Sequence, residues 1–225
     1  CKNMQQKEII ERLKTIPTGD LTDSMRRLGI SGYTKGIYCL QGKPTPNMVG
    51  PALTVQYIEK QPGQKTDFVG GQFAFARMAT DGQVIFIDAK GTQCWLTGGN
   101  VCRVAELAGA AGVVVDGCLR DKEEIASHKM PVYCKGSGTK PYAEELQLAA
   151  VNVPIDIDGC RVVPGDIVVG DDDGIVVIPA DRAEEIVYQA EDIADIEIKL
   201  AEAVERQASL EELGVIGGRK AVVRK

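Results

Sequence analysis

Residues 112–121 read Gly-Val-Val-Val-Asp-Gly-Cys-Leu-Arg-Asp, and this stretch decides the fold. Its continuous apolar run is typical of a strand that is buried on both faces, as in parallel sheets covered by helices. A similar run at 84–87 precedes it, and apolar residues with helical spacing lie between the two runs at 99–110. Apolar strands that alternate with helices predict parallel βαβ units and an α/β fold.

The same alternation extends in both directions from this unit. A strand is predicted before it at 51–58, and another is predicted after it at 132–134. Helical spacing predicts further helices at 5–13, 21–28, 67–78 and 122–128. Asp20 or Thr22 is a candidate N-cap for the helix at 21–28. The Gly- and Pro-rich segment 29–51 is expected to wrap the surface.

The pattern changes after residue 150. Short apolar runs separated by turn residues predict strands at 153–157, 161–163, 167–169 and 175–178. This close spacing favours an antiparallel β meander over further βα units. A long C-terminal helix is expected over about 180–207, and the basic tail 219–225 is expected to be loose. We therefore predict a single domain over 1–225, with mixed sheet layers inside and helices outside.

The composition excludes several classes of function. The 225 residues contain 26 Lys and Arg against 32 Asp and Glu, which gives a formal net charge of −6. This acidic balance argues against a partner that is nucleic acid, and no apolar run approaches the roughly 20 residues of a membrane span. A single His excludes multi-His zinc sites and a Ser–His–Asp triad. Seven cysteines without a C-x-x-C pair predict reduced thiols in a cytoplasmic protein.

Two turns that follow predicted parallel strands carry unusual residues. The first, Thr97-Gly98-Gly99-Asn100, opens the helix predicted at 99–110, where paired glycines let backbone N–H groups approach an anion. A tight turn that merely needs glycine explains the same residues. Ligands of α/β sheets bind beyond the carboxyl ends of the strands, so the turn at 116–121 is expected to meet the first one in one crevice.

The second turn places a guanidinium beside a carboxylate. In one interpretation, Arg120 is a fork for a substrate carboxylate and Asp121 is a ligand of a hard metal ion. In the other, the two side chains form a local ion pair and Asp121 caps the helix that begins at Lys122. Because neighbouring strands would bring Gly99 and Arg120 together, the two turns jointly favour the functional interpretation.

These residues resemble a known family. Gly99, twenty intervening residues, Arg120-Asp121, two more residues and Glu124 match the pattern G-x20-R-D-x2-E/D. This pattern marks the RraA-like family, which contains the class II 4-hydroxy-4-methyl-2-oxoglutarate aldolases and the regulator of ribonuclease activity A. Segments 49–55, 112–121 and 173–179 also look like family segments, so the resemblance covers about 18–205.

The resemblance implies a three-layer β/β/α swivelling-type fold, and a homotrimer or homohexamer with its active site between subunits. It also implies Mg²⁺ or Mn²⁺ as the cofactor and a 2-keto acid as the substrate. Asp121 would hold the metal largely through water, with Glu124 as a second metal-binding residue, and Arg120 would stabilise an enolate. The substrate would be bound by Arg120 and by the turn of Gly98, Gly99, Asn100 and Val101, with the backbone N–H groups of the last two holding its carboxylate.

One position departs from the aldolases of this family. They typically carry Asp twenty-one positions before the Arg, where it handles a proton through water, and this chain has Gly99 there. Aldol cleavage must deprotonate a hydroxyl, whereas decarboxylation of oxaloacetate needs no such base. The expected function is a metal-dependent carbon–carbon lyase that forms a pyruvate enolate by decarboxylation, aldol cleavage or both. The alternative is a non-catalytic regulator that binds a ribonuclease or another protein, because members with Gly at this position include the ribonuclease regulator.

Three other features are weaker candidates. Lys90 follows the strand at 84–87 and is the candidate lysine of a Schiff-base aldolase, which would need a buried amine with a depressed pKa. The Gly-rich segment 135–140 is expected to be an exposed connection or a mobile loop over the substrate. The acidic run 171–173 is expected to be a solvated turn, because it lacks the alternate spacing of a calcium loop.

The long C-terminal helix carries a stripe with alternating steps of four and three residues, formed by Ile186, Ala190, Ile193, Glu197, Leu200 and Val204. This is the spacing of a packed seam, in which a carboxylate is costly unless it is paired or used. Glu197 is predicted either to form a salt bridge at the helix edge, near Lys199 or Arg206, or to act catalytically in the metal site of a neighbouring subunit. The second reading rests on the resemblance, because Glu197 aligns with a glutamate that crosses the interface in the aldolases. A register that differs by one turn would point to Glu191 or Asp195.

Overall fold

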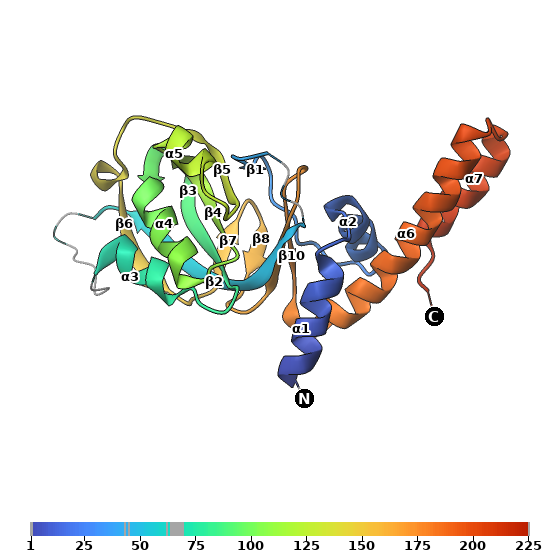
Figure 1. Ribbon diagram of the computed structural model, residues 1–225, viewed down its shortest axis with the longest axis horizontal. Helices are drawn as coiled ribbons and strands as arrows, with labels where there is room; N and C mark the ends of the chain where they lie inside the picture. Colours follow the sequence, from blue (N-terminus) through green and yellow to red (C-terminus); the bar gives the residue numbers. More distant parts are fainter. Residues whose placement is uncertain (1, 43, 45, 62, 64–69, 225) are drawn as a thin grey trace.

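The computed structural model describes residues 2–42, 44, 46–61, 63 and 70–224 (Figure 1). Its helices are α1 (Lys2–Leu13), α2 (Thr18–Arg27), α3 (Gly71–Met78), α4 (Gly99–Ala108), α5 (Lys122–Ala126), α6 (Ala183–Glu205) and α7 (Leu210–Gly218). The helices predicted at 5–13, 21–28, 99–110, 122–128 and 180–207 are confirmed with shifted ends. Helix α3 begins at Gly71, and residues 67–69 of the helix predicted at 67–78 lie outside the described residues.

A mostly parallel sheet forms the centre of the molecule. Its strands are β1 (Tyr38–Cys39), β2 (Met48–Glu59), β3 (Val84–Thr97), β4 (Gly112–Leu119), β5 (Val132–Ser137), β6 (Leu146–Val151), β9 (Ile167–Gly170) and β10 (Ile175–Ile178). Strands β2, β3, β4 and β5 are parallel neighbours, so the predicted βα units are confirmed. The order is β1-β5-β4-β3-β2-β9-β10, and β6 pairs with the second part of β2.

Apolar side chains on the two faces of this sheet build two cores. On one face, Ile85 and Val113 pack with Phe75 of α3 and Ala105 of α4, and α5 completes this layer. On the other face the sheet packs on a second, two-stranded sheet of β7 (Ile155–Ile157) and β8 (Cys160–Val162). Figure 1 shows helices α3, α4 and α5 and the small sheet on opposite sides of the central strands. The three-layer β/β/α architecture is therefore confirmed.

The strands after residue 150 divide between two sheets. Strands β7 and β8 form the small sheet, and the β9–β10 hairpin joins the central sheet through the first part of β2. The strands are antiparallel, as predicted from their spacing. Their distribution depends on β2, which is long enough to pair with β9 near Met48 and with β6 near Glu59.

A third core joins both ends of the chain. Helices α1, α2 and α6 pack against the β9–β10 hairpin (Figure 1). The buried stripe of α6 follows the predicted positions up to Ile193 and then turns to Ile196 and Ala203. Val204 is 54% exposed, so the last part of the predicted seam does not pack within the single chain. Glu197 consequently lies at the edge of the stripe rather than within it.

The C-terminal tail packs on α2 and α6 instead of being loose, over the residues described there. The guanidinium of Arg27 on α2 is fully buried and donates hydrogen bonds to the carbonyl oxygens of Arg219 and Lys220. The Gln189 side chain both accepts from the backbone N–H of Arg224 and donates to its carbonyl oxygen. The prediction of a loose tail is therefore wrong for these residues. The buried Arg27 needs acceptors for its N–H groups, and the tail carbonyls supply them.

Asp171 corrects two further predictions. It is buried, not solvated, and its carboxylate accepts hydrogen bonds from the backbone N–H of Thr18 at 2.8 Å, the Thr18 hydroxyl at 2.8 Å and the N–H of Asp173 at 2.9 Å. Helix α2 is therefore capped by a carboxylate from the β9–β10 turn. Neither Asp20 nor Thr22 caps it, because the helix begins earlier, after Pro17.

Replacing Asp171 with Ala is expected to lower the free energy of unfolding by about 2–4 kcal/mol, because three donors lose their acceptor in a buried place. Urea unfolding followed by circular dichroism measures this loss. The matched control is Asp172→Ala, which removes an exposed carboxylate from the same turn and should change the stability by no more than about 0.5 kcal/mol. Equal losses in the two variants would contradict the capping role.

Burial of the cysteines agrees with their predicted role as small core residues. Cys39, Cys94, Cys102, Cys118, Cys134 and Cys160 are buried free thiols. Burial raises the pKa of Cys134 to about 11 and that of Cys160 to about 12, so these thiols are protonated and unreactive at neutral pH. Among the described residues, no helix is long and apolar enough to cross a membrane.

Candidate active site at the β3–α4 and β4–α5 turns

The structure brings the two predicted turns together. Strands β3 and β4 are parallel neighbours, and their last residues, Thr97 and Leu119, are partners in the ladder. The backbone N–H of Arg120 donates to the carbonyl oxygen of Thr97 at 3.1 Å, which ties the second turn to the start of the first. The Gly98-Gly99 turn and the Arg120-Asp121 turn therefore lie side by side, at the N-terminus of α4.

The two glycines allow this close approach. A Cβ added at Gly98 would collide with Oδ2 of Asp121, and one added at Gly99 would collide with the carboxyl group of Glu124. Gly98 has an extended backbone, so the requirement for glycine is steric rather than conformational. Both carboxylates of the predicted metal site therefore lie against the same backbone turn.

Arg120 is held along its length while its tip stays open. Its Nε lies 3.3 Å from Oδ2 of Asp121, its stem passes next to Gly98, and its guanidinium carbon lies 4.2 Å from the centroid of the Trp95 ring. The side chain is 52% exposed. These contacts use Nε and one face of the guanidinium, so the terminal nitrogens remain available as a fork for an anion.

Asp121 does not cap α5. Its backbone is left-handed, with φ of 60°, and its side chain makes no capping hydrogen bond to that helix. Instead, Oδ2 accepts from the backbone N–H of Gly99 at 3.2 Å, in the first turn of α4. Of the two predicted interpretations, helix capping is wrong for α5, and the ion pair with Arg120 is confirmed. Both contacts fall on Oδ2, on the side of Asp121 that faces α4.

The donor set at this turn fits a hard divalent cation. Asp121 and Glu124 supply carboxylate oxygens, and the described part of the chain contains no group of three or more His, Cys, Asp or Glu side chains that would make an all-protein cage. Mg²⁺ commonly uses one or two carboxylates and keeps several waters, so two carboxylates suit it. Burial, with smaller contributions from Cys134, Glu124 and Asp121, raises the pKa of the Cys102 thiol to about 12.

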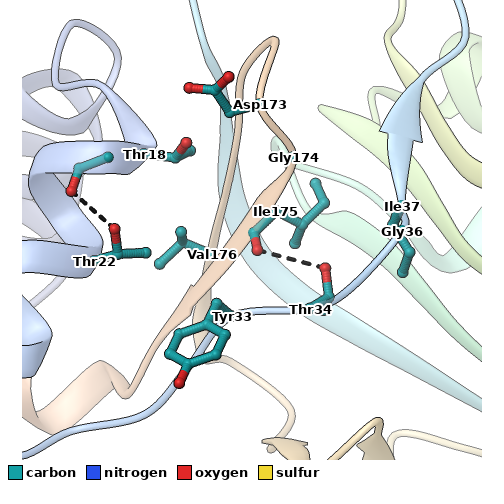
Figure 2. Close-up of a pocket in the computed structure, with 11 residues that line it drawn as sticks. Thr18, Thr22, Tyr33, Thr34, Gly36, Ile37, Asp173, Gly174, Ile175 and Val176 are labelled. Carbon is teal, nitrogen blue, oxygen red and sulfur yellow. Dashed lines mark hydrogen bonds between the residues drawn. The ribbon is translucent and has the colours of Figure 1, made fainter.

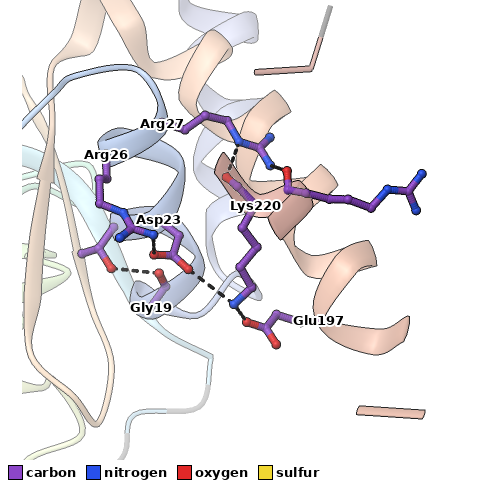
Figure 3. A network of polar contacts seen from close by, with 8 residues as sticks. Gly19, Asp23, Arg26, Arg27, Glu197 and Lys220 are labelled. Carbon is purple, nitrogen blue, oxygen red and sulfur yellow. Dashed lines mark hydrogen bonds and ion pairs between the residues drawn. The ribbon is translucent and has the colours of Figure 1, made fainter. Parts of the chain in front are cut away.

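Glu197 lies in a different part of the molecule. Figure 1 shows α6 and the α4–α5 turns toward opposite ends of the long axis, so one chain does not join Glu197 to Arg120. Figure 3 shows its ion pair with Lys220 of the tail, whose Nζ also lies 3.5 Å from Asp23. The predicted salt bridge at the helix edge is confirmed, with Lys220 as the partner instead of Lys199 or Arg206.

The other predicted candidates have partners of their own. Glu191 forms an ion pair with Arg12 at 2.8 Å. Lys90 lies 2.6 Å from a carboxylate oxygen of the buried Asp88, and its own side chain is 46% exposed. This exposed, ion-paired position differs from the buried amine that a Schiff-base aldolase needs.

A cavity elsewhere was not predicted from the sequence. It measures about 410 Å³ and lies between α2, residues 33–37 and the start of β10 (Figure 2). The hydroxyls of Thr18 and Thr22 are engaged with the protein, since Thr18 donates to Asp171 and Thr22 donates to the Gly19 carbonyl. Among the described residues that line this cavity, none carries a guanidinium or an amine, and none belongs to the Arg120 turn.

Sequence reasoning also missed Trp95, the aromatic partner of Arg120. It is the single tryptophan of the chain and lies near the end of β3, two residues before Thr97. The one sequence feature that could have indicated its role is its position just before the Gly98-Gly99 turn. The orientation of its ring depends on contacts with residues far away in the sequence.

Comparisons with known proteins agree with this fold. A family model described as RraA-like, Aldolase/RraA, matches residues 18–177. A Halalkalibacterium halodurans protein named "Putative 4-hydroxy-4-methyl-2-oxoglutarate aldolase" is 35% identical over 191 residues, which cover 83% of this chain and 85% of the relative. The fold and the match together show that the chain belongs to the RraA-like family.

Two crystal structures resemble most of the chain. An uncharacterized protein from Pseudomonas syringae pv. tomato superposes with a TM-score of 0.77 at 29% identity, over 92% of this chain and 96% of that one. Streptomyces coelicolor RraAS2, described as an unusual member of the RNase ES inhibitor RraA protein family, superposes with a TM-score of 0.76 at 30% identity, over 84% and 93%. Relatives with aldolase names and relatives with regulator names thus share this architecture.

Proposed function

We propose that the protein is a divalent-metal-dependent carbon–carbon lyase that acts on a 2-keto acid through a pyruvate enolate. The observation that carries the proposal is the Arg120 fork, which is held beside two carboxylates and the N-terminus of α4. The anion-binding donors suit the carboxylate of a 2-keto acid, and the pair of carboxylates suits a cation that binds its keto oxygen. The aldolase name of the Halalkalibacterium relative supports the reaction class.

The chain's own groups divide the work of binding. The backbone N–H groups of Asn100 and Val101 lie in the first turn of α4, where N–H groups lack helical partners and the helix dipole favours an anion. They would hold the substrate carboxylate. The terminal nitrogens of Arg120 would donate to the oxygen that becomes negative as the enolate forms. Asp121 and Glu124 would hold Mg²⁺ or Mn²⁺, which when bound polarises the keto oxygen.

Decarboxylation needs no further group from the protein. In oxaloacetate, the bond between C3 and the departing carboxylate breaks, its electron pair stays on the carbon chain as the enolate, and carbon dioxide leaves. Solvent then protonates the enolate to give pyruvate. Aldol cleavage also requires removal of a hydroxyl proton, and the carboxylate of Glu124 lies where a side chain at Gly99 would begin. Because Glu124 is assigned to the metal, aldol cleavage lacks a dedicated base and is expected to be the slower of the two reactions.

Replacing Gly99 with Asp is expected to raise the ratio of aldol cleavage to decarboxylation by at least about tenfold, because a positioned base commonly contributes 10²–10⁴-fold. The new side chain would displace Glu124, and it can do so cheaply because the collision is with the free end of a flexible side chain. Pyruvate release from both substrates measures the ratio. The control is Gly99→Ala, which has the same Cβ without the carboxylate. An unchanged ratio in a folded Asp variant would contradict the expectation.

A substrate panel tests the proposed function. Pyruvate release from oxaloacetate and from 4-hydroxy-2-oxo acids is measured with Mg²⁺, with EDTA, and with borohydride in the presence of substrate. Turnover that EDTA abolishes is the expected result. Covalent trapping by borohydride would indicate a Schiff base at a lysine such as Lys90. No turnover on any substrate would favour a regulator that binds a ribonuclease or another protein, which the RraAS2 likeness and Gly99 support.

We also propose that Glu197 completes the site of a neighbouring copy in a homotrimer or homohexamer. Glu197→Gln and Arg120→Ala are each expected to be nearly inactive. Unfolded together and refolded, they should regain part of the activity, because some mixed interfaces carry both intact residues. A mixture that stays inactive while wild-type subunits recover would contradict action across the interface.

A control separates this role from the ion pair inside the chain. Lys220→Met removes the partner of Glu197 but keeps its carboxylate. If Glu197 acts in the site, this variant should keep most of its activity. An inactive Lys220→Met would instead assign the loss in Glu197→Gln to the packing of the tail.

A further inference from the structure

We propose that Trp95 is a positioning residue: its indole face orients the Arg120 guanidinium so that the terminal nitrogens face the substrate. The inference rests on the proposed function, because it assigns Arg120 its role there. In this proposal, Trp95 has no contact of its own with the substrate. It would act through Arg120 alone.

Three contacts define the orientation of Arg120. The Trp95 ring covers one face of the guanidinium, with 4.2 Å between the guanidinium carbon and the ring centroid. Asp121 holds Nε, and the stem passes against Gly98, where a side chain would collide with it. An Arg side chain that is 52% exposed would otherwise sample many rotamers. The Trp95 ring restricts these rotamers through the guanidinium face, which Asp121 does not contact.

The ring is itself held rigidly from behind. Its Nε1 donates to the carbonyl oxygen of Thr139 at 3.1 Å, and its backbone N–H donates to the carbonyl oxygen of Lys140 at 2.8 Å. The Gly-rich segment 135–140 is thereby attached to β3. This segment, predicted as a connection, supports the Trp95 ring. An aromatic side chain with its polar edge bonded is a fixed surface for a cation.

Two tyrosines and a glutamine extend this support into the core. Tyr142 meets the Trp95 ring edge-on, with centroids 6.0 Å apart, and meets the fully buried Tyr57 edge-on at 5.5 Å. The Gln72 amide of α3 donates to the Tyr57 hydroxyl and to the carbonyl oxygen of Leu96, next to Trp95. The platform is therefore continuous from the core to Arg120.

The attraction between Arg120 and Trp95 comes from the π face of the ring. Its effect can therefore be separated by mutation from the effect of side-chain volume. A cation over Trp is attracted by the ring quadrupole, and Phe keeps a weaker quadrupole while Leu has none. If Trp95 only filled space or anchored residues 139–140, then Phe and Leu would be equivalent, because neither donates the Nε1 hydrogen bond. If it orients Arg120, Phe must be the better replacement.

Kinetics with oxaloacetate and Mg²⁺ test this difference. Trp95→Leu is expected to lower kcat/KM about tenfold, in the range of a partly desolvated cation–π contact, and to lower kcat more than it raises KM. Trp95→Phe should stay within about threefold of wild type. In the Arg120→Ala background, Trp95→Leu should have no further effect. Equal losses in the Phe and Leu variants, or an added loss in the Arg120→Ala background, would overturn the proposal.

A spectroscopic test needs no substrate and so stands apart from the proposed function. Because Trp95 is the single tryptophan, fluorescence excited selectively in tryptophan reports on this ring alone. Arg120→Ala uncovers one ring face and is expected to increase quenching by acrylamide at least about twofold, whereas the distant control Arg161→Ala should leave it unchanged. Unchanged quenching in Arg120→Ala would overturn the stacking. Absence of turnover in the wild type, with increased quenching in Arg120→Ala, would refute the proposed function and leave the orienting contact standing.

Discussion

Arg120→Ala is expected to lower kcat/KM for oxaloacetate decarboxylation by about 10²- to 10³-fold, the usual loss when a donor to a developing oxyanion is removed. The fold should persist, since the side chain is half exposed and its partners lie on the surface of the two turns. Steady-state kinetics and thermal unfolding on the same preparations measure both effects. The loss should appear mainly in kcat, because the enolate charge develops in the transition state.

Two variants decide whether the fork or the charge matters. Arg120→Lys keeps the charge but has no planar pair of donors, and Asp121 can no longer hold it through Nε, so it should recover little activity. Arg161→Ala removes an exposed guanidinium from β8 and should be as active as wild type. Turnover close to wild type in Arg120→Ala would contradict the role of Arg120 and, with it, the proposed mechanism.

Asp121→Ala is expected to weaken Mn²⁺ binding about 10- to 100-fold, because groups that hold a metal through water commonly contribute that much to its affinity. Isothermal titration calorimetry measures this without substrate or turnover. Asp121→Asn is the better-matched variant, because Asn tolerates the left-handed backbone at this position and its amide oxygen can still accept from the Gly99 N–H. It should retain the fold and lose most of the affinity.

Glu123→Gln is the control for this experiment. Glu123 is an exposed carboxylate on α5, next to Glu124 in the sequence but outside the contacts of the Gly98-Gly99 turn. Its replacement should leave Mn²⁺ affinity unchanged. If Mn²⁺ binds Asp121→Ala as tightly as wild type, then Asp121 serves only as the acceptor for Gly99 and the partner of Arg120.

The central layer follows from local sequence patterns. The runs at 84–87 and 112–115 are apolar without alternation, so they can only be buried on both faces, and helical spacing between them requires a parallel crossover. This places the two turns at one edge of the sheet. The spacing from Gly99 to Glu124 was therefore sufficient to predict which residues meet, and the contacts of Asp121 with Gly99 and Arg120 agree.

The errors share one physical cause. Asp171 was expected in water and is a buried cap for α2, and the basic tail was expected to be loose but satisfies the buried Arg27. Each buried polar group forms its hydrogen bonds with a partner more than a hundred residues away in the sequence. No local sequence pattern encodes such a partner. Within the single chain, the last turns of α6 also depart from the predicted seam, because the tail and α7 decide which of their sides is covered.

The sequence by itself determined the parallel core, the two glycine- and arginine-bearing turns and the family, because these depend on apolar periodicity and on fixed spacing within about 25 residues. Only the tertiary structure decided how Arg120 is oriented and what Glu197 contacts in one chain. The face of Trp95 and the ammonium of Lys220 reach these residues through side-chain packing between separate elements. Such packing depends on the positions of whole strands and helices, which single-residue patterns do not specify.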